Sequence, residues 1–363
     1  MTSYYACRTG AEEPNDRYRL QAACAAPALE TETWMRILVL GAAGFIGSQL
    51  VKILCTRKAL ACSGSAERPI AELVLADARP VPPVAVPAGV AIRIAQGDVR
   101  DDRFVESLFE EGFDCIFHLA ATLTLDAEGD FAQGLEVNLL ALVRLLERCR
   151  LQQRTPSFVF ASSISTFGGD LPEVVDDGVA HTPETSYGTH KAVAELLISD
   201  YSRRGFIDGR VLRLPIVLTH PGPGSASVSD RIAALIREPL NGRDAICPLD
   251  PRTRFPVASA RCVVKAMLEV LALPSGVFGA TRAMNLPSLS VTPASIEAAV
   301  LRAGVAGRAM GNIAWKPDAQ VQRIVDAWPR GFTSARARAL GIEGDASLDA
   351  IVAAYVEDYL AHA

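Results

Sequence analysis

The chain has 363 residues, half of them apolar, with 36 basic and 41 acidic side chains. This length can bury a large core, and the near balance of charge, without a Lys/Arg block, excludes a nucleic-acid partner. The longest apolar stretches are short and interrupted by charge, so no membrane partner is expected. Eight cysteines lack C-x-x-C or Cys/His spacing, which predicts free thiols in a reducing cytoplasm and no metal site.

Residues 1–34 differ in character from the rest of the chain. They contain acidic residues and lack the basic and then apolar order of a signal peptide. We expect a disordered N-terminal extension, or a start codon assigned too early, because Met35 lies directly before the first predicted strand.

From Met35 the predicted elements alternate between strand and helix. Short apolar, β-branched runs predict strands at 35–40, 72–76, 90–96, 114–120, 157–162 and 210–217. Helical spacing predicts helices at 45–55, 103–111, 131–150 and 186–204. This repetition implies right-handed crossovers and a parallel sheet covered on both faces, that is, an α/β, Rossmann-type doubly wound fold.

Beyond residue 217 the alternation ends. The stretch HPGPGSASVSD is rich in turn residues, and the later helical segments have fewer strands between them. We therefore expect a dinucleotide-binding Rossmann domain at 35–217, which carries the catalytic residues. Residues 218–363 are expected to form a smaller α/β substrate lobe interleaved with it.

The first strand runs into GAAGFIG, in which Gly41, Gly44 and Gly47 are spaced three apart around Phe45 and Ile46. Glycines there let backbone N–H groups approach a pyrophosphate, and the following helix presents its partly positive N-terminus. The same glycines could serve only a tight turn. The strand-then-helix context favours a dinucleotide site.

Asp77 ends the second strand. A carboxylate at that position can accept both ribose hydroxyls of an adenosine and repels a 2'-phosphate, so NAD is favoured over NADP. A surface turn aspartate is the alternative, and the neighbouring Arg79 keeps NADP open.

Tyr187 and Lys191 are four residues apart at the start of the fourth predicted helix. On one helix face, an ammonium can favour the ionised form of a phenol, which then serves as a general base. Spacing alone favours a solvated surface pair. The scarcity of lysine in this chain and the serines that end the preceding strand, Ser162 and Ser163, favour a catalytic pair.

Together, GAAGFIG, HLAA, ASSISTFGG and YGTHK resemble the extended short-chain dehydrogenase/reductase family, the NAD-dependent epimerase/dehydratase group, from Met35 onward. The resemblance implies NAD as cofactor and Tyr187 as the acid/base. It implies that Lys191 lowers the pKa of that phenol and holds the nicotinamide ribose, and that Ser163 binds the reacting hydroxyl. Further cofactor contacts implied in this way are Asp98, Val99, Leu119, Ala120, Ala121 and the segment from Pro215 to Val217. Asn138 matches a family asparagine that supports the active site, although Ala141-Leu142 replaces its usual glycine-threonine follow-up.

Stretches of the second half are similar to a subgroup of this family that oxidises C2 of a four-carbon sugar acid. A carboxylate substrate needs a donor, preferably a guanidinium. Arg254 and Arg231 are the candidates, although a surface role is equally open for Arg254. Arg213, within a predicted strand, is expected to be a structural ion-pair partner. Thr122, like Thr124, could bond a substrate hydroxyl or cap a turn.

Two other functions stay open. A nucleotide-sugar epimerase or dehydratase would use the same fold with NAD held throughout turnover, and a non-catalytic sensor would keep only the dinucleotide site. His118 and His190 are expected to be structural. Because dimers are usual in the family that the chain resembles, we expect a homodimer.

Overall fold

The computed structural model describes residues 34–85, 89–152, 154–218, 227–304 and 309–360. The chain divides into two compact units at Thr33 and Trp34, and the second unit holds all described residues. The expected N-terminal extension therefore lies outside the described residues, except for Trp34.

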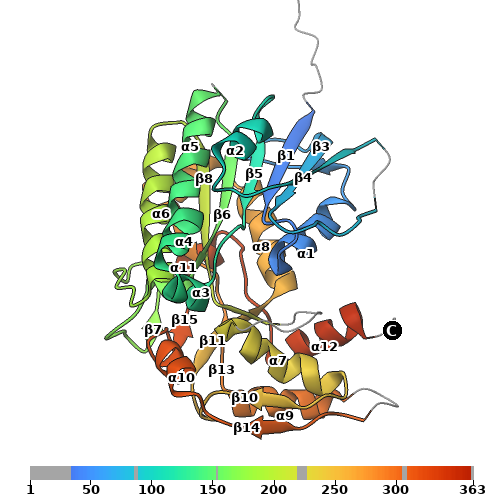
Figure 1. The fold of residues 1–363 in the computed structure, drawn as a ribbon, viewed down its shortest axis with the longest axis vertical. Helices are drawn as coiled ribbons and strands as arrows, with labels where there is room; N and C mark the ends of the chain where they lie inside the picture. Colours follow the sequence, from blue (N-terminus) through green and yellow to red (C-terminus); the bar gives the residue numbers. More distant parts are fainter. Residues whose placement is uncertain (1–33, 86–88, 153, 219–226, 305–308, 361–363) are drawn as a thin grey trace, which may run out of the picture. The chain divides into compact units, whose positions relative to one another are not determined.

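A parallel sheet forms the centre of this unit, in the order β4-β3-β1-β5-β6-β8-β12, with β2 antiparallel at β3 (Figure 1). Its strands are β1 (Met35–Leu40), β2 (Ala59–Leu60), β3 (Arg68–Asp77), β4 (Ala91–Gln96), β5 (Cys115–His118), β6 (Ser157–Ser163), β8 (Asp208–Leu214) and β12 (Ala283–Asn285). The strand order reverses beside β1, since β3 follows it on one side and β5 on the other. The predicted Rossmann-type α/β fold is confirmed.

Helices cover both faces of this sheet (Figure 1). They are α1 (Phe45–Leu54), α2 (Asp102–Leu108), α3 (Thr124–Gly129), α4 (Phe131–Leu135), α5 (Ala141–Leu151), α6 (Ser186–Arg203) and α8 (Ala260–Ala272). Side chains of β1 alternate between the two cores: Ile37 and Val39 pack with α1 and α8, whereas Leu38 and Leu40 pack with α2, α5 and α6. Because successive side chains enter two different apolar cores, the sequence of a central parallel strand is a continuous apolar run.

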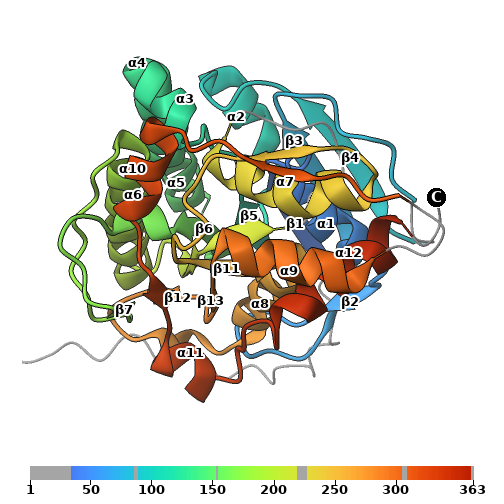
Figure 2. The same cartoon turned by 90° about the horizontal axis from the view of Figure 1, so that it is seen from below.

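The smaller part of the unit has its own core. It contains β7 (Val174–Val175), β9 (Ile216–Leu218), β10 (Ala245–Cys247), β11 (Phe255–Ser259), β13 (Leu289–Val291), β14 (Ile313–Trp315) and β15 (Gly331–Phe332). Its helices are α7 (Val228–Leu240), α9 (Pro293–Ala303), α10 (Ala319–Asp326), α11 (Ala335–Ala339) and α12 (Leu348–Tyr359). Helix α9 packs between α7 and α12 (Figure 2).

Two expected elements are broken in the structure. The segment predicted as one strand at 210–217 divides at Pro215, which has no N–H for a ladder, and β9 leaves the main sheet to pair with β11. The helix predicted at 131–150 contains a π-helical turn at Glu136–Leu140 between α4 and α5. Such turns are rare and often mark functional sites.

The two halves are interleaved along the chain. Strand β12 pairs with β8 in the main sheet, although the chain has by then passed through β9, β10 and β11. The division predicted at residues 217 and 218 assigns cofactor binding to the first part of the chain and substrate binding to the second. This division of roles stays a prediction.

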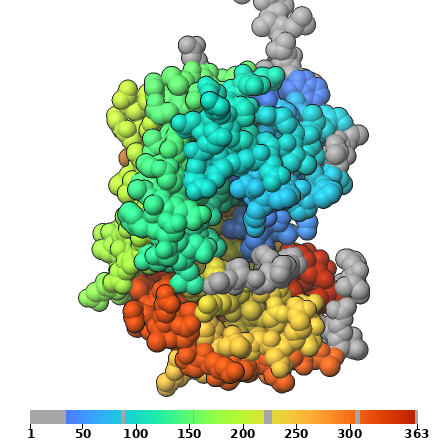
Figure 3. Space-filling model, in the orientation of Figure 1, coloured from blue at the N-terminus to red at the C-terminus, as the bar shows by residue number. Residues whose placement is uncertain are grey.

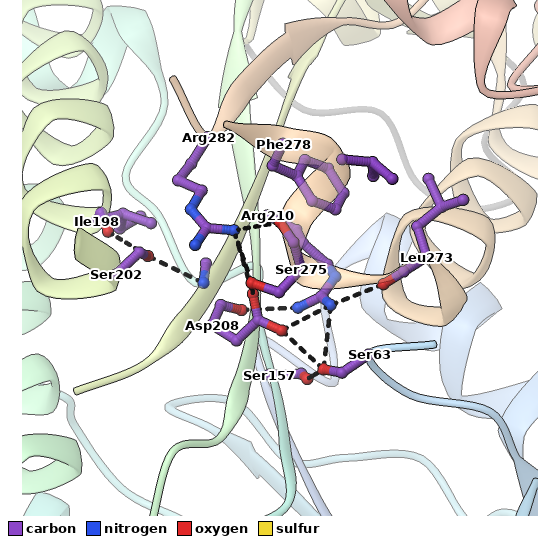
Figure 4. A network of polar contacts seen from close by, with 12 residues as sticks. Ser63, Ser157, Ile198, Ser202, Asp208, Arg210, Leu273, Ser275, Phe278 and Arg282 are labelled. Atoms are coloured by element: carbon purple, nitrogen blue, oxygen red, sulfur yellow. Dashed lines mark hydrogen bonds and ion pairs between the residues drawn. The ribbon is translucent and has the colours of Figure 1, made fainter. Parts of the chain in front are cut away.

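A buried polar network ties the N-terminal ends of β6 and β8 to neighbouring loops (Figure 4). The Asp208 carboxylate accepts hydrogen bonds from Ser63 and Ser275, each at 2.7 Å, and its Oδ2 lies 2.8 Å from Arg210 Nη2. Arg210 is fully buried, and its guanidinium also donates to the Leu273 carbonyl at 3.0 Å. The network therefore fixes the end of the sheet at which β6 and β8 begin.

Replacing Arg210 by alanine leaves the Asp208 carboxylate buried without its main cation. We expect the free energy of unfolding, measured by urea denaturation, to fall by about 3–5 kcal/mol. The control is Arg203→Ala, which removes an exposed ion pair with Asp200 and should cost at most about 1 kcal/mol. Equal losses in the two variants would contradict this role for the network.

Candidate active site

A cavity of about 940 Å³ opens where the strands of the main sheet end. Figure 3 shows the surface hollowed between the green and blue part, which carries the main sheet, and the yellow and orange part below it. The predicted site residues that line this cavity are Gly41, Gly44, Phe45, Ile46, Gly47, Asp77, Asp98, Val99, Leu119, Ala120, Ala121, Thr122, Ser163, Tyr187, Lys191, Pro215 and Val217. The ends of parallel strands beside a reversal of strand order are where ligands bind in such sheets.

The glycine loop between β1 and α1 is tightly packed. Gly41 has φ +87°, and a Cβ there would lie 2.7 Å from the backbone nitrogen of Ala120. A Cβ at Gly47 would lie 2.0 Å from the Gly41 carbonyl oxygen. The N-cap of α1 is Gly44, which provides no capping side chain. The backbone at the start of α1 is thus presented to the cavity, as a pyrophosphate site requires.

Asp77 both faces the cavity and holds this loop. Its carboxylate accepts hydrogen bonds from the N–H groups of Ala43 and Arg79, each at 2.9 Å. The Arg79 side chain is two-thirds exposed, and its Nε lies 3.5 Å from Asp77 Oδ1. The predicted ribose acceptor therefore has a structural role as well, which the sequence pattern did not indicate.

Asp98 follows β4 and is paired with Arg100, their side chains 2.6 Å apart. The hydrogen bond from Arg100 lowers the pKa of this carboxyl. Both residues line the cavity with Val99, so they form one part of its wall.

Asn138 lies in the π-helical turn and is almost fully buried. Its side-chain amide bonds both backbone groups of Thr122, accepting from the N–H at 2.9 Å and donating to the carbonyl at 3.0 Å. Thr122 is thereby fixed at the cavity wall directly after the HLAA segment. This is a supporting role for Asn138, as the resemblance implies.

Tyr187 and Lys191 lie in the first turns of α6, beside the end of β6. The Ser163 hydroxyl lies close enough to Tyr187 to lower the pKa of its phenol, and it also accepts from the Ser165 N–H at 3.1 Å. Lys191 donates to the Ala161 carbonyl at 2.8 Å, and its ammonium lies 4.4 Å from the centre of the Phe160 ring. Helix α6 begins with Thr185 as N-cap, whose side chain accepts from the Gly188 N–H.

Burial shifts the pKa of each of these two residues in the direction that favours its neutral form. It raises the pKa of Tyr187 to about 12, against the smaller, lowering effect of the nearby Ser163 hydroxyl. Burial lowers the pKa of Lys191 to about 7, against the charge of Glu195. The expectation that Lys191 brings the pKa of the phenol toward neutrality is thus not met by these two residues alone, because desolvation is the largest cause of both pKa shifts.

The two histidines near the pair behave as structural residues. His118 is buried beside Phe158 and Phe160, and burial, followed by the charge of Lys191, lowers the pKa of this imidazole to about 3. His190 is also buried and packs near Phe131. Neither lines the cavity in the described part of the chain.

Arg231 and Arg254 are not brought to the cavity wall. Arg231 Nη1 lies 3.1 Å from Asp318, and Arg254 is ion-paired with Glu173. The prediction that one of them binds a substrate carboxylate has no support in this geometry, because each contacts a carboxylate outside the cavity. Arg213, expected to be a structural ion-pair partner, is buried against Glu195 at 2.9 Å, which confirms that prediction.

Sequence reasoning missed several lining residues beyond β9. Ser227, Ser229 and Trp328 line the cavity from the smaller part of the unit. Ser227 and Ser229 lie at the start of α7, at the end of the turn-rich stretch HPGPGSASVSD, and that context was the available signal. Trp328 belongs to no motif, so the sequence offered no signal for it.

The described residues contain no group of three or more His, Cys, Asp or Glu that could hold a metal ion. The six cysteines within the described ranges are free thiols. Among the described helices, none combines the length and apolar character needed to cross a membrane.

Residues 37–281 match the model of the NAD dependent epimerase/dehydratase family. The chain belongs to this family. It is 42% identical to the D-erythronate dehydrogenase of Cupriavidus necator over 89% of this chain and 98% of that protein. It is 35% identical to the D-erythronate dehydrogenase of Haemophilus influenzae, over 89% and 99% of the two chains.

Solved structures of the family share the fold. The nucleoside-diphosphate-sugar epimerase from Agrobacterium tumefaciens superposes with a TM-score of 0.81 at 35% identity, covering 91% of this chain and 96% of that one. A GalE-like L-threonine dehydrogenase from Cupriavidus necator gives a TM-score of 0.76 at 24% identity, over 89% and 99% of the chains. The family resemblance is confirmed: the chain is an NAD-dependent oxidoreductase that acts on a CH–OH group, and NAD is its cofactor.

The closeness of Gly47 to Gly41 can be tested with Gly47→Ala. The added methyl group must displace α1 from the loop, so we expect NAD+ affinity, measured by calorimetry, to fall about tenfold or more. Gly276→Ala is the control, since open space surrounds that glycine. A Gly47→Ala variant with unchanged NAD+ affinity would contradict this account of the loop.

Proposed function

We propose that this enzyme oxidises D-erythronate at C2, with NAD+ as hydride acceptor, to give 2-oxo-tetronate, NADH and a proton. The observation that carries the proposal is the 42% identity to the Cupriavidus necator D-erythronate dehydrogenase over 98% of that protein. The match covers 89% of this chain, so it includes residues of the smaller part of the unit, which supplies Ser229 and Trp328 to the cavity wall.

Tyr187 is the general base in this proposal. Its phenolate removes the proton of the C2 hydroxyl while C2 gives up its hydride. Ser163, which lies near the same phenol, donates to the oxygen that becomes a carbonyl. The ammonium of Lys191 lies 5.6 Å from the centre of the Tyr187 ring and stabilises the phenolate by its charge.

The cofactor site fits NAD. The glycine loop brings backbone close to a pyrophosphate, and Asp77 offers its carboxylate to the adenosine ribose. Bound NAD+ supplies a hydride acceptor and a positive charge that further favours the phenolate.

The substrate carboxylate is held, in this proposal, by donors other than arginine. In the described part of the cavity wall the basic side chains are Arg79, Arg100 and Lys191. Arg79 and Arg100 follow β3 and β4, and they are assigned to the adenosine end. The hydroxyls of Thr122, Ser165 and Ser229, which also line the cavity, are then assigned as the donors for the acid.

A nucleotide-sugar epimerase is the second candidate. The Agrobacterium tumefaciens epimerase, at 35% identity and a TM-score of 0.81, is the observation that favours it. An epimerase returns the hydride in each turnover and keeps its NAD. The serine, tyrosine and lysine at the cavity argue against a sensor without chemistry.

The substrate assignment predicts NADH formation from D-erythronate. Purified protein should reduce NAD+ with D-erythronate at a rate at least about tenfold above that with L-erythronate or either threonate, because C2 must face the cofactor in one configuration. The measurement is NADH absorbance. Lack of reaction with all four acids, with NAD retained through purification, would favour the epimerase.

Tyr187→Phe should lose about 10²–10⁴-fold in kcat while NAD+ affinity stays close to that of the wild type, because only the proton acceptor is removed. In the wild type, kcat/KM should rise with pH, since deprotonation produces the active form and burial holds the pKa of Tyr187 high. That rise should disappear in the variant.

The matched control is Tyr201→Phe on the same helix, whose hydroxyl bonds Glu147 and does not line the cavity. It should leave kcat and its pH dependence unchanged. A Tyr187→Phe enzyme as active as the Tyr201→Phe enzyme would remove Tyr187 from the chemistry.

A further inference from the structure

A buried carboxylate lies one helical turn beyond Lys191. Glu195 is only 3% exposed, and its Oε1 accepts a hydrogen bond of 2.5 Å from Ser162, the residue before Ser163 in β6. Lys191 in turn bonds the carbonyl of Ala161. Successive residues at the end of β6 are thus bonded to successive turns of α6.

Arg213 completes the environment of this carboxylate. It lies opposite Ser162 in the register of β6 and β8, and its guanidinium donates to both Glu195 oxygens at 2.9–3.1 Å. Arg213 also donates to Asn285 of β12 at 3.1 Å. Both members of the ion pair are at least 96% buried, since their side chains are 4% and 3% exposed. A pair held this rigidly fixes the position of α6 on the sheet.

Glu195 also affects the protonation of Lys191. Burial lowers the pKa of Lys191, and the Glu195 carboxylate opposes this effect. Within the described residues, five titratable or charged groups surround Lys191 and Glu195. They are Tyr187 and His190 of α6, His118 of β5, Arg213 of β8 and His181, whose Nε2 lies 3.5 Å from Glu195. Among all these groups, only Glu195 brings a negative charge that favours the ammonium.

We propose that Glu195 is a positioning residue of the active site: its carboxylate, held by Ser162 and Arg213, keeps the proton on Lys191 and fixes the end of β6 against α6. When Lys191 holds the proton, Tyr187 can be the deprotonated member of the pair. Without Glu195 the proton stays on Tyr187, and Lys191 becomes neutral. This inference rests on the roles proposed above for Tyr187 and Lys191.

The charge is tested by Glu195→Gln, which keeps the shape of the side chain. The chain has five lysines, so the Lys191 signal can be followed by NMR in protein labelled with carbon-13 lysine and assigned by its loss in Lys191→Arg. The titration midpoint of Lys191, expected near 7 in the wild type, should fall by about one unit in Glu195→Gln.

Asp200→Asn is the matched control, because it removes an exposed carboxylate from the same helix. It should leave the Lys191 midpoint unchanged. Equal midpoints in Glu195→Gln and the wild type would overturn the proposal. This titration needs no substrate, so its failure is separate from a failure of D-erythronate as substrate.

The link between Glu195 and β6 is tested by Ser162→Ala, which keeps the charges of Glu195 and Lys191. This variant also tests the positioning role of Glu195 if Glu195→Gln does not fold. We expect kcat to fall about tenfold, the equivalent of one hydrogen bond, with KM and the Lys191 midpoint unchanged. A structural role alone would lower the melting temperature and leave kcat as in the wild type, and that result would overturn the proposal.

Discussion

The geometry of the site depends on how closely the first turn of α6 approaches the end of β6. A Cβ at Gly188 would lie 1.9 Å from the carbonyl oxygen of Ser165, so the helix can take this position only because the residue after Tyr187 is a glycine. Any side chain there must push α6 outward. The distances from Tyr187 and Lys191 to β6 therefore depend on a residue that takes no part in the chemistry.

This close approach also determines the electrostatics of the site. It buries the phenol and the ammonium together, and burial penalises the charged form of each. Lys265, which is more exposed and lies four residues before Glu269 on a helix, behaves differently: its hydrogen bond to the Glu269 carboxylate raises the pKa of Lys265. Lys191 also has a glutamate four residues later, Glu195, yet its pKa is lowered, because burial outweighs the effect of that carboxylate.

The sequence was sufficient for most strands of the main sheet and for the glycine loop and the Ser163, Tyr187 and Lys191 part of the cavity wall. Glycine spacing and apolar periodicity are local properties, and they predicted the loop before α1 and the alternation around β1. Arg231 and Arg254 form ion pairs with Asp318 and Glu173, which are distant from them in the sequence. No local pattern reveals such partners. The π-helical turn that presents Asn138 to Thr122 was hidden within ordinary helical spacing for the same reason.

Buried partners of Lys191 were equally out of reach of local patterns. Glu195 is visible in SYGTHKAVAELL as an acid four residues after the lysine, a spacing that usually indicates a solvated helix face. Its burial depends on Arg213, which reaches it from a neighbouring strand. A one-dimensional pattern contains the spacing but not the partner.

The return of β12 to the main sheet affects how the molecule is made. Ala283 pairs with Val211, so the edge of the sheet beside β8 is completed only after the intervening chain has been synthesised. Until then β8 has an unpaired edge, a position from which strands associate wrongly with other chains. Arg213 meets Asn285 only across that late pairing. On the ribosome, the environment of Glu195 is therefore completed only after Asn285 has been synthesised.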